Sequence, residues 1–496
     1  MLIMGNNKKR RRNEMNKDVI CNPYLPSYEY VPDGEPHVFG DRLYIFGSHD
    51  RFDGKEYCEN DYVCWSAPTQ NLKQWRYEGI IYKRSQDPAC KGEQSHMYAP
   101  DVAQGPDGRY YMYYGLDFVN RIAVAVSDTP AGQYEYYGEV VYPDGIRYGG
   151  RDKELLRFDP AILADDDGRI WLYTGFSPKE PYFQTVAEKE NMTIETMGNC
   201  VVELERDMKT IKSDSIPLLP GVDNSKGTGF EGHEFYEASS IRKFNGKYYF
   251  IYSSFLSHEL AYAVSDRPDG GFVYQGPLHS NGNIGYDGNQ EAQFYWGNNH
   301  GSVECVNGKY YIFGHRQTNY NECSRQGVAE PLMMDENGKF SMAEMTSSGL
   351  NDGPLPCGRS YEAGIACFLQ EKDGACKITQ GNEEHRRKRL MITQNGPDRE
   401  SDPCQYVANI KDGSVVGYKY FDMQKVTSIT VEIKGSANGQ LYVYTDLEKA
   451  PVGFFNITPS CEIIKLTMDL NIADGVTPIY FKYSGSGMMD FIRFGI

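Results

Sequence analysis

Residues 107–115 read DGRYYMYYG, a glycine turn followed by a run of aromatic and apolar residues, and this pattern decides the fold. Four more copies follow the same pattern: GDRLYIFGS at 40–48, DGRIWLYTG at 167–175, GKYYFIYSS at 246–254 and GKYYIFGHR at 308–316. Turn residues next to a Tyr- and Ile-rich stretch are typical of a β-hairpin, so each copy predicts two paired strands.

The spacing of the copies predicts one sheet for each. Their glycines lie at positions 40, 108, 168, 246 and 308, intervals of roughly 60 to 80 residues that suffice for four strands and a loop. A further strand-like run ending in an acidic turn follows two of the copies, at 122–128 and 260–266. Hairpins arising by chance would not share this spacing. We therefore expect five antiparallel sheets closed radially into a β-propeller, which leaves only short edges.

The organisation of the chain is predicted from its length and from where the repeat stops. A chain of 496 residues exceeds what one core usually organises, and the repeat ends after Pro331. Short strand-like runs then continue to the C-terminus at a spacing typical of an antiparallel sandwich. The fold class is therefore all-β, a five-bladed β-propeller followed by a β-sandwich. The predicted parts are a disordered basic N-terminal arm at 1–19, the propeller at 20–335, a linker at 336–360 and the sandwich at 361–496.

Composition excludes several classes of function. The net charge of −17 argues against nucleic acid as a partner, because binding its backbone takes a concentrated basic surface. The basic run at 8–12 is read as a disordered tail, with a targeting or nucleic-acid arm as the alternative. No stretch of about 18 apolar residues predicts a membrane span, and no apolar segment follows the basic run as in a signal peptide. With 12 scattered cysteines, we expect reduced thiols and a cytoplasmic location.

A polar residue precedes each copy of the repeat by five to nine positions. These residues are Glu35, Asp101, Asp159, Glu237 and His300. The inner strands of a propeller line one central channel, so side chains at its mouth converge although they are far apart in sequence. Converging carboxylates titrate apart, so that one stays protonated while another stays ionised. Hydrolysis of a glycosidic bond requires such a pair.

The residues around these positions resemble glycoside hydrolase family 43. The motifs that carry the resemblance are YAPDV at 98–102, FDPAI at 158–162, FYEASSIRK at 235–243 and NHGSV at 299–303. Together they cover about residues 20 to 330. The resemblance implies a five-bladed propeller that acts on arabinose- and xylose-containing glycans.

The resemblance also implies three catalytic roles. Glu237 is expected to be the general acid, Asp159 to raise the pKa of Glu237 and orient it, and Glu35 to be the base that activates water for an inverting attack. The family usually has Asp where this chain has Glu35, so Asp33, two residues earlier, is the alternative base.

Further residues are predicted to hold the sugar or an ion. The expected substrate-binding set is Phe46, Trp65, Tyr98, Asp101, Phe235, Trp296, His300 and Arg316. Core packing is the alternative for the aromatic residues and Arg316, a turn or solvated charge for Asp101, and a hydrogen-bonded structural role for His300. Aromatic faces stack on sugars, and polar groups hydrogen-bond their hydroxyls. His300 is also the candidate ligand for a Ca²⁺ near the propeller axis, although the acid and base chemistry needs no cofactor.

The expected function is an inverting exo-glycosidase that releases a terminal pentose from plant-type oligosaccharides. The leading prediction is an α-L-arabinofuranosidase, with β-D-xylosidase and a non-catalytic glycan-binding propeller as the alternatives. The C-terminal part resembles a family 6 carbohydrate-binding module through its strand order and the closing DFIRF at 490–494. All four Trp residues lie in the propeller, however, so a structural role for the sandwich is an equal alternative.

Overall fold

The computed structural model describes residues 18–117, 119–151, 153–178, 198–398 and 405–496. Most of the predicted basic arm therefore lies outside the described residues. Nearly all the regular structure is β, with one short α-helix, α3 (Glu383–Arg387), in the described part of the chain. No helix in these ranges has the length and apolar character needed to cross a bilayer. The all-β prediction is confirmed.

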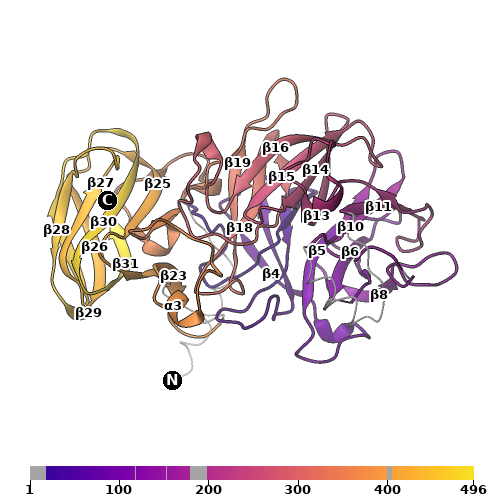
Figure 1. The fold of residues 1–496 in the computed structure, drawn as a ribbon, viewed down its shortest axis with the longest axis horizontal. Helices are drawn as coiled ribbons and strands as arrows, with labels where there is room; N and C mark the ends of the chain where they lie inside the picture. The colour runs from indigo at the N-terminus through magenta and orange to yellow at the C-terminus, as the bar shows by residue number, and fades with distance from the viewer. Residues whose placement is uncertain (1–17, 118, 152, 179–197, 399–404) are drawn as a thin grey trace.

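The part of the chain up to residue 332 forms five antiparallel sheets with strands in sequence order, as the repeat predicts (Figure 1). The sheets are β1 (Glu35–Phe39), β2 (Arg42–Phe46), β3 (Tyr62–Pro68), β4 (Arg76–Tyr82); β5 (Met97–Gln104), β6 (Tyr110–Leu116), β7 (Ala123–Ser127), β8 (Glu135–Glu139); β9 (Ala161–Ala164), β10 (Ile170–Gly175), β11 (Asn199–Leu204), β12 (Ile216–Pro217); β13 (Phe235–Phe244), β14 (Lys247–Ser254), β15 (Glu259–Ser265), β16 (Val273–Ser280); and β17 (Val303–Val306), β18 (Lys309–Arg316), β19 (Gln326–Leu332). Short 3-10 turns occur at η1 (Arg84–Gln86), η2 (Val222–Asn224), η3 (Tyr286–Gly288), η4 (Gly349–Asn351) and η5 (Ala363–Ile365).

The motif glycines explain why each copy forms a hairpin. All five lie between the first two strands of their sheets with φ between 64° and 85°, in the left-handed region that glycine adopts without steric cost. In the fifth sheet the prediction of four strands is wrong. After β19 the chain packs Phe340 edge-on against Tyr310, with ring centroids 5.2 Å apart, instead of adding a strand.

Buried apolar clusters close the five sheets into a ring. Each cluster joins the central strands of two neighbouring sheets, through the pairs Tyr62 and Met112, Tyr113 and Leu172, Tyr173 and Phe250, Ile251 and Ile312, and Phe313 and Ile45. The last pair links the fifth sheet back to the first. Because this closure pairs every sheet with two others, the inner strands β1, β5, β9, β13 and β17 meet around one axis.

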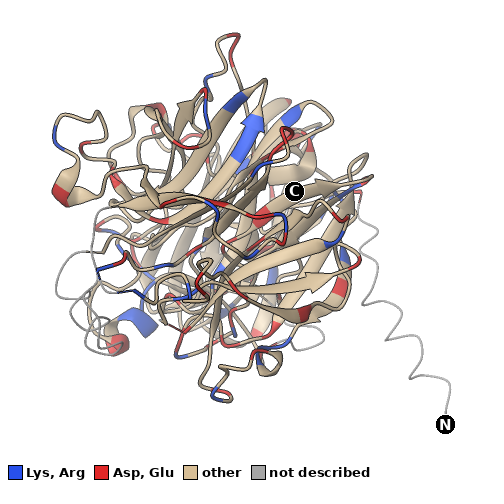
Figure 2. Ribbon diagram, turned by 90° about the vertical axis from the view of Figure 1, so that its right-hand side faces the viewer, with Lys and Arg blue, Asp and Glu red and all other residues tan. Residues whose placement is uncertain are grey.

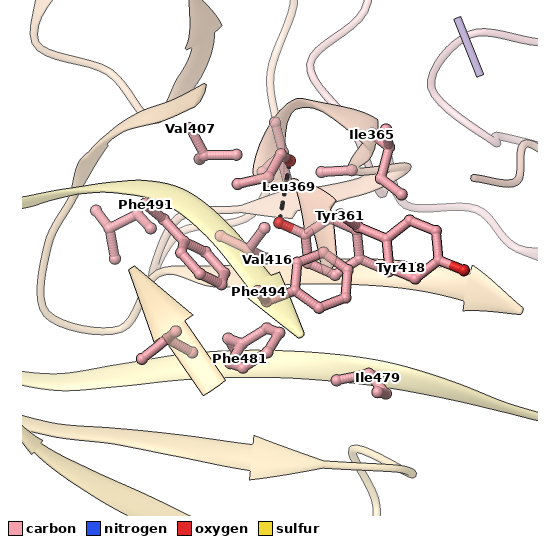
Figure 3. Packing of buried hydrophobic residues seen from close by; sticks show 14 of the residues in the cluster. Tyr361, Ile365, Leu369, Val407, Val416, Tyr418, Ile479, Phe481, Phe491 and Phe494 are labelled. Atoms are coloured by element: carbon pink, nitrogen blue, oxygen red, sulfur yellow. Dashed lines mark hydrogen bonds between the residues drawn. The ribbon is translucent and has the colours of Figure 1, made fainter. Parts of the chain in front are cut away.

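Two six-stranded sheets form the C-terminal sandwich, to the side of the propeller in Figure 1. Their strands are β20 (Leu355–Pro356), β22 (Phe368–Gln370), β25 (Val415–Met423), β27 (Asn438–Tyr444), β28 (Gly453–Ile457) and β30 (Gly475–Ser486) in one sheet, and β21 (Ser360–Glu362), β23 (Met391–Gln394), β24 (Gln405–Ile410), β26 (Ser428–Gly435), β29 (Ser460–Asp469) and β31 (Met489–Gly495) in the other. Their inner faces pack Tyr418, Phe481 and Phe494 against one another, and Tyr418 Oη donates to the Ala363 carbonyl at 3.0 Å (Figure 3).

The sandwich core continues into the propeller side of the chain. Phe294, Tyr295 and Tyr320, which lie on loops around β17 and β18, belong to the same buried cluster as the sandwich strands. Within the predicted linker, Leu355 pairs with Phe421 of β25, so the sandwich takes in residues that precede 361. The two parts therefore share apolar packing across their contact.

Charged residues of both signs are interspersed along the strands and loops (Figure 2). Asp33, Asp159 and Arg325 are exceptions, because all three are charged-type side chains that are buried in the propeller.

Candidate active site

A pocket of about 280 Å³ lies at the convergence of the inner strands. It is small for a ligand site, most of which span about 300–1,000 Å³. Its lining is Asp33, Tyr57, Tyr98, Ala99, Phe158, Asp159, Phe176, Tyr236, Glu237, Ser257, Asn298, His300, Glu322, Arg325 and Lys377. The pocket thus combines carboxylates with aromatic faces, as a sugar site requires.

Glu237 enters the pocket through an irregularity in β13. The pairing with β14 shifts register on both sides of Glu237, and the next residue, Ala238, has φ of 65°. A bulge of this kind re-aims a side chain and is common beside active sites. Desolvation and the charge of Asp33 raise the pKa of Glu237 to about 8, while Arg325 acts in the opposite direction. Among the described residues, none hydrogen-bonds the Glu237 carboxyl, so its proton faces the pocket.

Asp159 lies just before β9 and holds the backbone next to Glu237. It has φ of 44°, and its Oδ2 accepts a hydrogen bond from the Ala238 N–H at 2.9 Å. Burial raises the pKa of Asp159 well above its usual range, and the charges of Glu237 and Asp33 add to the effect. Asp159 is therefore placed to orient Glu237 through the Ala238 N–H, whereas the predicted effect of Asp159 on the pKa of Glu237 is not seen, because burial and Asp33 raise that pKa.

Asp33 is held in the ionised form. Arg325 Nη1 donates to Asp33 Oδ1 at 2.9 Å, and His315 Nδ1 lies 3.3 Å from the same oxygen. Burial alone would raise the pKa of Asp33, but the Arg325 charge and the contact with His315 outweigh it and lower that pKa well below the usual range. The pocket thus contains an ionised carboxylate, Asp33, together with two carboxyls whose pKa values are raised, Glu237 and Asp159.

Glu35, predicted to be the base, lies outside the pocket, and this prediction is corrected. Its Oε2 accepts hydrogen bonds from Arg242 Nη2 at 2.8 Å and from Ser240 Oγ at 3.1 Å. Burial raises the pKa of Glu35 to about 8 in spite of Arg242. Asp33 lies in the bend before β1, with φ of 56°, whereas Glu35 is the first residue of the strand. Asp33, the alternative, does line the pocket.

Asp101 lies beyond the pocket as well, where it joins three sheets. Its Oδ1 is 2.6 Å from His37 Nε2, and its Oδ2 accepts from the Ile162 N–H at 2.8 Å. Both oxygens are thus occupied by protein groups from β1 and β9. The prediction that Asp101 binds substrate is wrong, because the residue is fully buried and absent from the pocket lining.

Of the predicted aromatic residues, Tyr98 alone lines the pocket. Phe46, Trp65 and Phe235 belong to the clusters between sheets, and Trp65 Nε1 donates to Glu29 at 3.0 Å. Trp296 is outside the lining and contacts the His258 ring instead. Phe46, Trp65 and Phe235 therefore pack in the core, which was the alternative to sugar binding. The aromatic wall consists instead of Tyr57, Tyr98, Phe158, Phe176 and Tyr236.

Arg316 is buried at the contact with the sandwich and does not reach the pocket. It donates to the Ala366 carbonyl and to the side chains of Gln326 and Gln405, and burial lowers its pKa to about 10. Arg325, nine residues on, is the pocket arginine. The repeat could not indicate Arg325, because it lies in the loop after the fifth copy and has no equivalent in the others. Phe158 and Tyr236, in contrast, directly precede Asp159 and Glu237 in the sequence. Their position next to the predicted carboxylates could have indicated that they line the pocket.

His300 does line the pocket, but its neighbours do not form a metal-ligand set. Its Nδ1 is 3.6 Å from Asp159 Oδ2 and 3.9 Å from Asp33 Oδ1, and burial lowers its pKa to about 4, so the ring is neutral near pH 7. In the described ranges, a close group of three potential ligands occurs at Glu35, His37 and Asp101, where Arg242 already supplies a positive charge. His300 as a Ca²⁺ ligand stays a prediction, in which waters would supply most of the oxygen ligands that Ca²⁺ takes.

Comparisons with known proteins identify the family of this chain. The family model described as "Glycosyl hydrolases family 43" matches residues 30–340. A protein named "Xylosidase/arabinosidase" from Thermoclostridium stercorarium is 45% identical over 476 residues, which are 94% of this chain and 96% of that protein. Another of that name, from Bacteroides ovatus, is 30% identical and covers 59% of this chain and 87% of its own.

A solved structure of a family member is also similar to this chain over about the length of the propeller. The GH43_1 enzyme from Xanthomonas citri, complexed with xylotriose, has a TM-score of 0.50 at 25% identity and covers 66% of this chain and 93% of its own. The family model covers more than half of the present chain, and the Thermoclostridium relative aligns along almost all of it. The chain therefore belongs to glycoside hydrolase family 43.

Proposed function

We propose that this protein is an inverting exo-glycosidase that removes a terminal pentose from oligosaccharides, with Asp33 as base and Glu237 as acid. One observation carries the proposal: the same pocket holds a carboxylate that Arg325 keeps ionised and a carboxyl whose pKa is raised to about 8. This is the protonation state in which both groups are needed at the start of an inverting reaction.

Asp33 acts on the attacking water. Its carboxylate accepts a proton from water as the oxygen forms a bond to the anomeric carbon. Arg325 also donates to Asp50, so its guanidinium is fixed on both sides and keeps Asp33 in place. A base fixed in this way loses little freedom when the substrate binds.

Glu237 acts on the leaving group from the other side of the bond. Its proton passes to the glycosidic oxygen as the bond to the anomeric carbon breaks, so the sugar and an uncharged alcohol leave together. Burial and the charge of Asp33 keep the Glu237 carboxyl protonated until this step, and Asp159 holds the neighbouring backbone through the Ala238 N–H. A single displacement from the opposite face inverts the anomeric configuration.

The substrate proposed first is a terminal α-L-arabinofuranoside, and the second candidate is a β-D-xyloside. The name of the Thermoclostridium relative, "Xylosidase/arabinosidase", refers to both sugars, and this supports both candidate substrates. A small pocket with an aromatic wall suits one terminal pentose, which has one carbon fewer than a hexose.

We expect the enzyme to release its sugar with inverted configuration. The test substrates are 4-nitrophenyl α-L-arabinofuranoside and 4-nitrophenyl β-D-xyloside. Proton NMR recorded from the first minutes of hydrolysis shows which substrate is cleaved and which anomer of the sugar appears first. Release of the β-anomer of arabinose or the α-anomer of xylose supports the proposal. Retained configuration contradicts the roles of Asp33 and Glu237, and an inert protein on both substrates and on their disaccharides favours a glycan-binding propeller.

The dependence of kcat/KM on pH should show a falling limb near pH 8. The pKa of Glu237 is raised, so the competent protonated form is present below about pH 8 and is lost as the pH rises through that value. The pKa of Asp33 is lowered, so the base stays ionised down to acidic pH and gives no limb between pH 5 and 7. Initial rates at low substrate from pH 4 to 10 test this, and a rise in rate through pH 8 would contradict the assignment of the acid.

A further inference from the structure

Lys377 lines the pocket although it belongs to the C-terminal half of the chain. It lies between β22 and α3, beyond the residues 30–340 that the family model matches. Every other pocket-lining residue comes from the propeller half, between Asp33 and Arg325. The C-terminal half therefore contributes a side chain to the pocket.

The backbone around Lys377 is fixed against the propeller. The Trp296 N–H donates to the Cys376 carbonyl at 3.2 Å, and the Ile378 N–H donates to the Trp296 carbonyl at 2.6 Å. On the other side, Arg389 Nη1 donates to the Lys377 carbonyl at 3.1 Å. The approach needs a glycine at 297, because a Cβ there would lie 2.8 Å from Cγ2 of Ile378. Lys377 is thus presented by a backbone that is held on both faces.

The ammonium of Lys377 has no ion-pair partner among the described residues. Its nitrogen lies 5.5 Å from the centroid of the Trp296 ring, a weak contact that leaves its N–H donors available. Arg325, the other pocket cation, already donates to Asp33 and Asp50. Lys377 is therefore the lining cation with donors to spare for a ligand.

Burial places Lys377 at the mouth of the pocket. The floor residues Asp33, Asp159 and His300 are only 4%, 3% and 6% exposed, whereas Lys377 and Asn298 are partly exposed. A terminal sugar bound over the floor directs its leaving group outward, towards the partly exposed residues. Three N–H donors on an ammonium suit the hydroxyl oxygens of a sugar at that place.

We infer that Lys377 is a specificity-determining residue that hydrogen-bonds the sugar on the leaving-group side of the scissile bond. The inference rests on the proposed function, because it requires the terminal sugar to occupy the floor. It makes the C-terminal half a part of substrate selection, favouring glycosides whose leaving group is itself a sugar.

The test compares Lys377→Met with wild type on substrates that differ only in the leaving group. Methionine keeps the stem that packs along the pocket edge but removes the donors. The substrates are 4-nitrophenyl α-L-arabinofuranoside and β-D-xyloside, which lack a leaving-group sugar, and 1,5-α-L-arabinobiose and xylobiose, which have one. We expect kcat/KM for the disaccharide of the preferred pentose to fall about tenfold or more, the worth of a hydrogen bond to a charged group, and for the aryl glycoside less than about twofold.

Two variants complete the design. Lys372→Met alters an exposed lysine five residues away that is outside the pocket lining, and it should change neither rate. Lys377→Arg restores donors and should recover part of the disaccharide rate. Equal losses on both kinds of substrate, or no loss on the disaccharide, overturn the inference while the proposed function stands. A wild type inert towards all four substrates overturns the proposed function and this inference with it.

Discussion

Replacing Asp33 by Asn is expected to lower kcat roughly 10³-fold, because an amide cannot accept the proton of the attacking water. The fold should tolerate the change. Arg325 keeps two hydrogen bonds to Asp50, at 2.9 Å each, so it is not left as an unpaired buried charge. The measurement is kcat on the better of the two aryl pentosides, with thermal unfolding followed in parallel.

Glu35→Gln is the matched control for this variant. Glu35 is two residues from Asp33, equally buried and likewise paired with an arginine, but it lies outside the pocket. Burial raises its pKa to about 8, so the neutral amide resembles the form present near pH 7. We expect kcat within a few-fold of wild type. If Glu35→Gln lost activity as severely as Asp33→Asn, or if Asp33→Asn stayed active, Asp33 would not be the base.

Glu237→Gln is expected to lose roughly 10³-fold in kcat/KM on xylobiose or arabinobiose and far less on 2,4-dinitrophenyl glycosides. A sugar alkoxide is a poor leaving group and needs the proton, whereas dinitrophenolate leaves without it. The falling limb near pH 8 should disappear in the variant, because the group that titrates there is gone. Steady-state rates across leaving groups of different pKa measure both effects.

The pair of substrates is the internal control for Glu237. No described residue hydrogen-bonds its carboxyl, so the substitution breaks no protein contact that would disturb both reactions alike. Equal losses on the two leaving groups would show that Glu237 binds or orients the substrate and does not protonate it.

The propeller could be predicted from the sequence because each of its hairpins is specified by a short, continuous stretch of residues. A glycine with positive φ followed by alternating aromatic and apolar residues specifies a hairpin without reference to the rest of the chain, and five copies at similar intervals imply the ring. The sandwich was predicted from strand spacing alone. Its start was less well predicted, since β20 forms only where Leu355 meets Phe421, 66 positions away in the chain.

The pocket was predicted in part, and the failures have one physical origin. Asp159 and Glu237 do lie together, since each sits at the beginning of an inner strand. Glu35 lies on an inner strand as well, but the convergence of these strands does not tell which residue at the start of β1 reaches the pocket. The structure puts Asp33, in the bend before β1, in the lining and leaves Glu35 out. Arg325 and Lys377 arise from loops outside the repeat, where only tertiary contacts decide which side chain reaches the centre.

Phe294, Tyr295 and Tyr320 share apolar packing with the sandwich strands. The catalytic half therefore cannot be separated from the sandwich without exposing part of a shared core. A gene truncated where the family model ends, at residue 340, would expose those rings to water and invite aggregation. Exchanging the sandwich for another module in a fusion enzyme would meet the same obstacle, unless the replacement carried a matching apolar face. Protein engineers who add new domains to this enzyme should therefore leave the two halves together.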